Sequence, residues 1–277
     1  MAPDQYCQDK AAKSGSSFYY SFLFLPPDRR RAITALYAFC REVDDVVDEA
    51  HDVEVARMKL AWWRTEIASV FSGGAQHPVA RALVPVTQQF HLPEARFNEI
   101  IDGMEMDLTQ NRYADFSELE TYCYRVAGAV GLMAAEIFGY RDRHTLDYAR
   151  DLGTAFQLTN IIRDVREDAL RNRIYLPLDE LARFSVSPEA ILRADRNFDL
   201  RDLIAFQIDR ARKYYRRAFD VLPAGDRRAQ RPGLVMAAIY LKLLDKIEAD
   251  GCRVLDRRAS ITPIRKLWIA WTTWLRG

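Results

Sequence analysis

The sequence predicts an all-α protein with a single domain over residues 1–277, in which long helices enclose a central cavity. Apolar residues recur at the i, i+3, i+4 and i+7 positions along most of the 277 residues. No segment shows the alternation of polar and apolar residues that is typical of a half-buried strand. The breaks between helical segments are short, and none has the length or composition of an interdomain linker.

The first predicted helix spans about residues 29–49, and its apolar face consists of Ile33, Leu36, Tyr37, Cys40, Val43 and Val47. Further helices are predicted at about 53–71, 79–90, 94–111, 116–138, 142–170, 199–222, 232–254 and 262–275. Proline and glycine residues separate them, namely Pro26-Pro27, Gly73-Gly74, Pro93, Gly139, Pro177, Pro188, Pro223 and Pro232. The segment 171–177 is the least helical part of the centre and predicts a loop after a helix.

Composition excludes several classes of function. The chain has 40 Lys and Arg against 39 Asp and Glu, so it lacks the basic excess expected of a nucleic-acid-binding protein. Its four cysteines are scattered, which favours reduced thiols over disulfides or a zinc site. The first ten residues lack the apolar run of a secretory signal, and no apolar stretch is long enough to span a bilayer. We therefore expect a cytoplasmic protein.

An unusual carboxylate pattern lies on the first predicted helix. Asp44 falls within the apolar face and Asp48 at its edge, in line with Tyr37 and Arg41. Burying a lone carboxylate costs several kcal/mol unless it is paired or bound to a metal. The pattern therefore predicts either a metal site or ion pairs with Arg41 or with an arginine of another helix.

A second stripe of oxygen donors lies on the predicted helix 142–170. Gln157, Asn160, Asp164 and Asp168 follow one another at i, i+3, i+7 and i+11, between apolar residues. Carboxylate and amide oxygens are ligands that suit Mg²⁺. Two acidic stripes on otherwise apolar helices predict opposing walls of a cavity, with Mg²⁺ and arginine between them able to neutralise a diphosphate.

Two long motifs in the same order resemble the squalene/phytoene synthase family. They are DDVVD (residues 44–48) after ALYAFCREV, and NIIRDVRED (residues 160–168) after QLT and before RIYLP. The resemblance covers essentially the whole chain, including YCYRVAGAVG at residues 122–131. The opening SGSSFYYSF is similar to the branch found in hopanoid operons. Dehydrosqualene synthases tend to have His-Ser-x-Ser where this chain has residues 14–17, a departure that weakens the assignment of the serines.

The resemblance implies an isoprenoid synthase helical bundle that joins two farnesyl diphosphates head to head, giving presqualene diphosphate for hopanoid or squalene synthesis. It implies Mg²⁺ as cofactor and no need for NADPH. The metal ligands would be Asp44, Asp48, Asn160, Asp164 and Asp168. Substrate would be bound by Ser14, Ser16, Ser17, Tyr37, Arg41, Gln157, Arg163, Arg173 and Tyr240. Catalysis would involve Tyr37, Arg41, Tyr122, Arg163 and Tyr175, with Val126, Gly128 and Gly131 lining a prenyl tunnel or allowing close helix packing.

Three alternatives remain at this point. Phytoene, dehydrosqualene and squalene synthases share the first half of the reaction, and only product analysis separates them. A chain-elongating prenyltransferase would fit DDVVD, but its usual partner is a second DDxxD motif instead of the Asn160–Asp164–Asp168 series. A catalytically inactive binding or assembly protein would be favoured by loss of either acidic set, and both are intact.

The C-terminal segment ITPIRKLWIAWTTWLRG predicts an amphipathic helix that is rich in tryptophan and basic residues. Its apolar face would consist of Ile264, Leu267, Trp268, Trp271 and Leu275, with positive charge from Arg265, Lys266 and Arg276. Such helices suit the headgroup region of a bilayer. The helix therefore predicts either peripheral contact with the inner face of the membrane or a closing helix, with Trp268, Trp271 and Trp274 packed on the domain.

Overall fold

The computed structural model of the chain describes residues 2–13, 21–22, 24–49, 52–195 and 198–276. The helices are α1 (Pro3–Lys13), α3 (Pro27–Asp48), α4 (Val53–Ser72), α5 (Pro78–Phe90), α6 (Glu94–Thr109), α7 (Phe116–Cys123), α8 (Ala129–Phe138), α9 (His144–Leu170), α10 (Leu178–Arg183), α11 (Pro188–Leu192), α12 (Arg201–Val221), α13 (Arg231–Ala249) and α14 (Pro263–Arg276), and a π-helical turn, η1 (Tyr124–Gly128), joins α7 to α8. Within these ranges there is no strand, and a single bridge pairs Arg112 with Ile174. The all-α prediction is confirmed.

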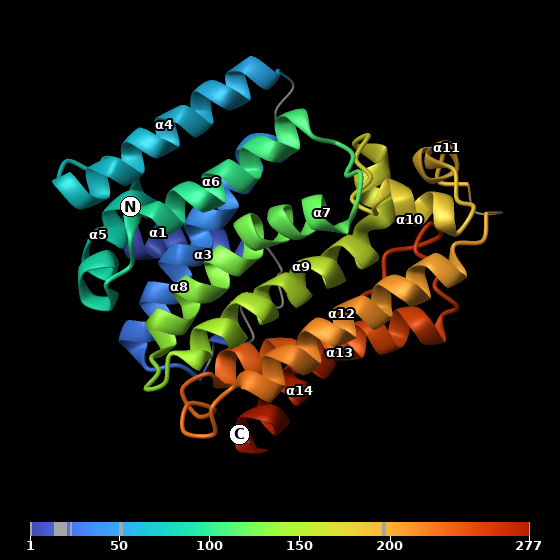
Figure 1. Cartoon of the computed structure of the whole chain (residues 1–277). Helices are drawn as coiled ribbons and strands as arrows, with labels where there is room; N and C mark the ends of the chain where they lie inside the picture. The colour runs from blue at the N-terminus through green and yellow to red at the C-terminus, as the bar shows by residue number, and fades with distance from the viewer. Residues whose placement is uncertain (1, 14–20, 23, 50–51, 196–197, 277) are drawn as a thin grey trace.

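Helix α9 is the central element of the bundle. It has 27 residues and is therefore about 40 Å long. Figure 1 shows it running through the middle of the molecule, with α12 beside it, α4 and α6 to one side, and α13 and α14 to the other. From Asp151 to Thr159 residues on all sides of the helix are buried, because α8, α12, α13 and η1 pack around it.

Helix α3 begins where the sequence places two prolines. Pro27 occupies the first turn, where its missing N–H costs nothing and its fixed φ suits a helix. Leu36, Phe39 and Val43 are fully buried against neighbouring helices. Tyr37, which lies beside this buried face, lines a cavity, so α3 packs with one face and presents another to the cavity.

Two hydrophobic cores meet at the middle of the bundle. One gathers residues of α3 to α6 and α8, the other residues of α9, α12 and α13, and Val126 of η1 packs against both. Helices α8 and α9 approach closely between them: a Cβ on Gly131 would lie 2.3 Å from the carbonyl oxygen of Ala149. The close-packing interpretation of Gly131 is therefore confirmed. One domain over residues 1–277 stays a prediction.

The sequence prediction differs from the structure in a few places. Helix α1 was not predicted, because only Cys7 and Ala11 of its eleven residues are buried and the apolar periodicity is weak. The short helices α10 and α11 were also not predicted. The expected continuous helix at 116–138 is wrong at 124–128, where the backbone forms the π turn. No helix in the described part of the chain combines the length and apolarity needed to cross a membrane.

Candidate active site

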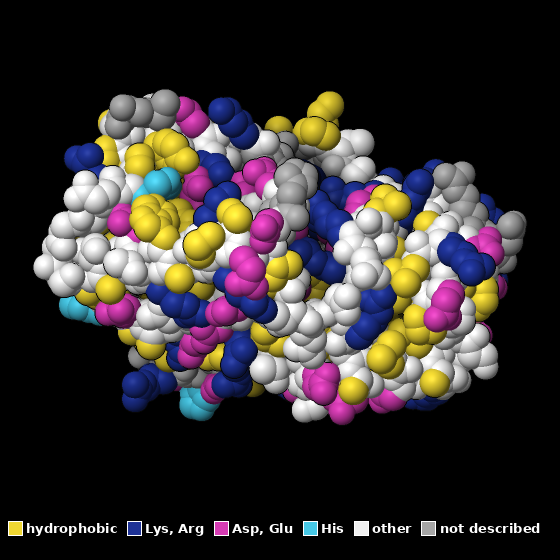
Figure 2. All heavy atoms as spheres, turned by 90° about the horizontal axis from the view of Figure 1, so that it is seen from above, with side chains coloured by type: hydrophobic (Ala, Val, Ile, Leu, Met, Phe, Trp, Pro, Cys, Tyr) yellow, Lys and Arg dark blue, Asp and Glu magenta, His cyan; other side chains and the backbone are white. Residues whose placement is uncertain are grey.

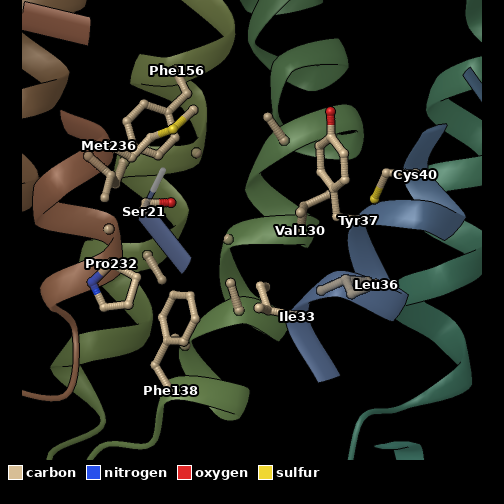
Figure 3. A pocket seen from close by; sticks show the side chains of 18 of the residues that line it. Ser21, Ile33, Leu36, Tyr37, Cys40, Val130, Phe138, Phe156, Pro232 and Met236 are labelled. Atoms are coloured by element: carbon tan, nitrogen blue, oxygen red, sulfur yellow. The ribbon is translucent and has the colours of Figure 1, made fainter. Parts of the chain in front are cut away.

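An apolar cavity of about 160 Å³ lies where the two cores meet. Figure 3 shows Ile33, Leu36 and Tyr37 of α3, Val130 and Phe138 of α8, Phe156 of α9, and Pro232 and Met236 of α13 around it. Of the predicted tunnel residues, Val126 and Gly131 line the cavity, whereas the Cβ position of Gly128 faces the Tyr124 ring.

One end of the cavity is polar and lies between α3 and α9. Tyr37 contributes from α3, and Gln157 and Asn160 contribute from α9. The Tyr240 hydroxyl donates to Oδ1 of Asn160 at 3.1 Å, and Nδ2 of Asn160 donates to Oε1 of Gln157 at 3.3 Å. These two hydrogen bonds orient the amide of Asn160, because its oxygen and nitrogen each have a defined partner.

The carboxylates of α3 are paired with arginines from two parts of the chain. Arg41 donates to Asp44 within the helix, and its Nη2 also donates to Oδ1 of Asp45 at 2.6 Å. Asp48 accepts from Nη1 of Arg173 at 2.9 Å and pairs with Arg171 at 3.2 Å. Burial, reinforced by the charge of Asp48, nevertheless raises the pKa of Asp44 to about 6. The ion-pair alternative for this helix is therefore present in the structure.

The carboxylates of α9 have contrasting environments. Asp164 accepts hydrogen bonds from Arg163 and from Nε of Arg258, the latter at 2.6 Å. Burial acts to raise the pKa of Asp164, but the hydrogen bonds and charges of these guanidinium groups outweigh burial. The pKa of Asp164 therefore lies below its usual value. Burial and then the charge of Asp164 raise the pKa of Asp168 to about 8. Arg173 and Arg171 therefore offset the charge of Asp168 only in part.

A third helix contributes a carboxylate that the motif analysis did not single out. Asp107 of α6 accepts from the hydroxyls of Tyr122 at 2.9 Å and of Tyr175 at 2.7 Å. Burial raises the pKa of Asp107 to about 6 even though Arg173 and both tyrosines favour its charged form. The charge of Asp107 in turn contributes to the raised pKa values of Asp44 and Asp168. Carboxylates from α3, α6 and α9 therefore share one electrostatic site.

The predicted tyrosines occupy two different places. Tyr37 lines the cavity, and Tyr240 reaches its polar end through Asn160. Tyr122 and Tyr175 instead stack on each other, with ring centroids 5.1 Å apart, and both hydroxyls donate to Asp107. Within the described part of the chain neither lines the apolar cavity. Ser14, Ser16 and Ser17 lie outside the described residues.

The arginines at this site already have carboxylate partners. Five arginines pair with or lie beside six carboxylates: Arg41, Arg163, Arg171, Arg173 and Arg258 with Asp44, Asp45, Asp48, Asp107, Asp164 and Asp168. Figure 2 shows Lys and Arg side chains gathered around a hollow near the middle of one face. No three His, Cys, Asp or Glu side chains converge as a preformed metal cluster among the described residues.

Sequence signals existed for some of the residues that the motif analysis did not identify. Asp107 continues the buried series of Ile100 and Met104 on α6 at helical spacing, so it could have been identified as a carboxylate on a buried face. Arg171 belongs to the loop that follows α9, next to the predicted Arg173. Arg258 is almost a hundred residues from Asp164 in the chain, and nothing in its local sequence indicates the contact.

Asp107→Asn is expected to lower turnover about tenfold, because hydrogen bonds to a charged acceptor exceed neutral ones by about 1–1.5 kcal/mol. The substitution keeps the shape of the side chain but weakens its hold on Tyr122 and Tyr175 and removes the charge opposite Arg173. Initial rates measure the effect, and circular dichroism melting checks the fold. Asp102→Asn on the same helix, where Asp102 is 41% exposed, is the matched control. Turnover equal to that of the control would restrict Asp107 to a structural role.

Comparisons with known proteins indicate one family. The family model described as squalene/phytoene synthase matches residues 11–265. A 15-cis-phytoene synthase from Synechocystis is 38% identical, with 98% of this chain and 84% of the relative covered. Phytoene synthase 2 of Solanum lycopersicum is 36% identical, with 94% and 86% covered.

Solved structures show the same relationship. A dehydrosqualene synthase in complex with a ligand superposes with a TM-score of 0.87 at 28% identity, covering 99% of this chain and 96% of that one. A squalene synthase from Alicyclobacillus acidocaldarius superposes with a TM-score of 0.80 at 27% identity, covering 90% and 94%. The helical bundle is therefore shared with proteins that carry these names.

Proposed function

The chain belongs to the squalene/phytoene synthase family, and from that premise we propose that it joins two prenyl diphosphates head to head in a Mg²⁺-dependent reaction. The main support is the position of the cavity. Its polar end is lined by Tyr37, two turns before Asp44 of the α3 motif, and by Asn160, the first residue of the α9 motif, and apart from Ser21 and two glutamines the rest of its wall is apolar. A diphosphate group fits the acidic motifs next to the polar end, and an isoprenoid chain fits the apolar part.

The residues present fit Mg²⁺ by the chemistry of their donors. The two motifs offer carboxylate and amide oxygens, the ligands that Mg²⁺ prefers. The raised pKa values of Asp44 and Asp168 indicate negative charge that the arginines do not fully offset. Two diphosphates would add further negative charge to a site whose arginines already have carboxylate partners. Mg²⁺ held by Asp44, Asp48, Asn160, Asp164 and Asp168 would supply the missing positive charge and stabilise the leaving diphosphate.

The residues of the chain have distinct tasks in the proposed reaction. Arg41, Arg163 and Arg173 bind and orient the diphosphates, so that the C1–O bond of one substrate breaks with both electrons leaving on diphosphate. The apolar wall excludes water, which would otherwise capture the allylic cation. The ring faces of Tyr37 and Phe156 stabilise this cation through their π-electrons.

The bonds of the proposed step balance. The C2=C3 double bond of the second substrate attacks C1 of the cation, forming one carbon–carbon bond and moving the positive charge to C3. Loss of a proton from the attacked carbon then closes a cyclopropane ring, with the second diphosphate retained. The departing diphosphate is an available base for this proton.

Two final products have separate support. The names of the relatives favour phytoene, which requires a longer substrate and a second ionisation of the cyclopropyl diphosphate. The resemblance of the opening residues to the hopanoid branch favours farnesyl diphosphate as substrate and presqualene diphosphate as product, without NADPH. The two candidates share the first half-reaction, and the roles proposed above for Mg²⁺ and for the arginines belong to that half-reaction.

Incubation of the protein with Mg²⁺ and either farnesyl or geranylgeranyl diphosphate, with and without NADPH, tests the proposal. Mass spectrometry would identify a C30 cyclopropyl diphosphate in the first case and a C40 hydrocarbon in the second. A C30 hydrocarbon that requires NADPH would indicate a squalene synthase. No condensed product from either substrate would favour the inactive binding or assembly protein, despite its intact acidic motifs.

Phe138→Ala is expected to raise the rate with geranylgeranyl diphosphate relative to farnesyl diphosphate about tenfold. In Figure 3 Phe138 lies at the end of the cavity away from Phe156 and the Tyr37 hydroxyl, so its removal lengthens the apolar part. Competition between the two substrates measures the ratio directly, whatever fraction of the protein is active. Val130→Ala, which widens the wall partway along, is the control. An unchanged ratio would show that Phe138 does not limit chain length.

A further inference from the structure

Helix α14 has two apolar faces, and only one of them packs on the protein. Ala270 is fully buried, and Ile269 and Trp274 pack against the core formed with α9, α12 and α13. The second face is exposed and consists of Ile264 (81%), Leu267 (44%), Trp268 (63%), Trp271 (49%) and Leu275 (64%). Since the inner face already closes the bundle, packing does not account for the outer one.

The outer face forms a continuous strip. At about 100° per residue its five side chains fall within a sector about 100° wide, next to the inner face. Trp268 and Trp271 lie against each other on this strip, with ring centroids 5.5 Å apart. Indole rings combine a large apolar surface with a polar N–H, which favours the boundary between headgroups and acyl chains.

The charge around the strip suits an anionic surface. The last 27 residues contain six Arg or Lys and one Asp, whereas the whole chain has a net charge of only +1. Arg258 pairs with Asp164 at the active site, and Arg257 pairs with Asp250. The charge available to the strip therefore comes from the remaining basic residues, of which the exposed Arg265 lies on α14 itself. Basic residues close to a bilayer contribute about 1 kcal/mol each when the lipids are anionic. Docking onto an apolar surface of another protein would not be strengthened by this positive charge.

The position of α14 connects the strip with the cavity. Near its start, burial and then the positive charges of Arg163 and Arg258 lower the pKa of Lys266, so this end lies beside the charged site. At its other end Trp274 contacts Phe24, with ring centroids 5.3 Å apart, and lies 5.5 Å from the Arg231 guanidinium. Pro232, which follows Arg231 in the chain, lines the apolar end of the cavity. Helix α14 thus lies alongside the cavity from its charged to its apolar part.

We propose that the outer face of α14 docks the protein onto the interface of a bilayer that contains anionic lipid. The helix is about 21 Å long, shorter than the roughly 30 Å hydrocarbon core, and its inner face is attached to the protein, so it lies in the plane of the interface. This proposal extends the proposed function: docking there places the apolar end of the cavity next to the phase in which long prenyl chains dissolve.

Vesicle co-sedimentation of the full-length protein tests the proposal without any substrate. We expect the wild type to bind vesicles of phosphatidylcholine with phosphatidylglycerol at least about tenfold more tightly than vesicles of phosphatidylcholine alone. The double variant Trp268→Ser/Trp271→Ser should lose at least about tenfold in binding to the anionic vesicles. Trp62→Ser, which removes a tryptophan that is 46% exposed on α4, should bind as the wild type does.

Equal binding by the double variant and the wild type would overturn the proposal, as would failure of the wild type to bind anionic vesicles. A dimer in sedimentation equilibrium that the double substitution dissociates, together with no vesicle binding, would assign the strip to a second copy of the chain. Turnover of detergent-dispersed substrate by the double variant should match the wild type, because neither tryptophan belongs to the active site. The two proposals can therefore fail independently.

Discussion

Removal of divalent cations with EDTA is expected to reduce product formation about a thousandfold or more, and excess Mg²⁺ is expected to restore it. A metal ion contributes several kcal/mol to the stabilisation of a leaving phosphate group, which corresponds to a factor of this size. The site requires that contribution because its arginines are already balanced by carboxylates before a substrate arrives. Product formation is measured after dialysis against chelator.

Circular dichroism in the same buffers separates loss of metal from loss of fold. The helices of the bundle are held by two apolar cores, so EDTA should leave the spectrum unchanged. Full turnover in chelator with the fold intact would show that Asp44 and Asp164 serve only as partners of Arg41 and Arg163.

Asp44→Asn and Asp164→Asn are each expected to lower turnover a hundredfold or more, as is typical when one preorganised electrostatic group is lost. Asparagine retains the shape but removes the charge that would hold Mg²⁺. Asp164→Asn also releases Arg163 and Arg258 from their shared partner. Steady-state rates at saturating Mg²⁺ measure the loss.

Matched controls exist on both helices. Asp28 of α3 is 61% exposed and pairs with Arg31, and Asp147 of α9 is 47% exposed and pairs with Arg150. Asp28→Asn and Asp147→Asn should leave turnover within about twofold, since exposed ion pairs contribute little. If Asp44→Asn or Asp164→Asn behaved like its control, that aspartate would be a structural carboxylate.

The helical architecture and the two acidic stripes could be predicted because both depend on spacing within single helices. Tyr37, Asp44, Gln157 and Asn160 fall on predicted faces, and the cavity lies beside them. Spacing also identified the outer face of α14 residue by residue, as the exposed side chains show. It did not reveal that Trp274 turns inward, because that depends on contacts with Phe24 and Arg231.

Contacts between distant segments explain what the sequence left undetermined. Arg258 reaches Asp164 and Asp107 reaches Tyr175 across long stretches of chain, and no local pattern encodes either pair. Helix α1 depends on the same kind of contact: Lys10 bridges Glu42 at 3.0 Å and Asp45 at 2.8 Å on α3. Isolated short polar helices are marginal in water, so α1 forms where α3 supplies partners.

The alternative interpretations of the acidic helices turn out to be compatible. Asp44 and Asp48 do pair with arginines, as the ion-pair alternative required, and Asp164 on the second helix pairs with Arg163 as well. The same arginines supply the positive charge that a diphosphate needs. Asp168 differs, because burial and the neighbouring Asp164 raise its pKa to about 8. It is the carboxyl group that an added cation would stabilise most.

The position of a carbon label in the product tests head-to-head joining most directly. A prenyl diphosphate labelled with ¹³C at C1 would be converted in the presence of Mg²⁺, and the product analysed by NMR. The account predicts two labels in one molecule, separated by one carbon in a cyclopropyl diphosphate or directly bonded after rearrangement to a hydrocarbon. A product with a single label, formed only when isopentenyl diphosphate is added and joined to C1 of the labelled chain, would contradict it, as would hydrolysed prenyl alcohol alone.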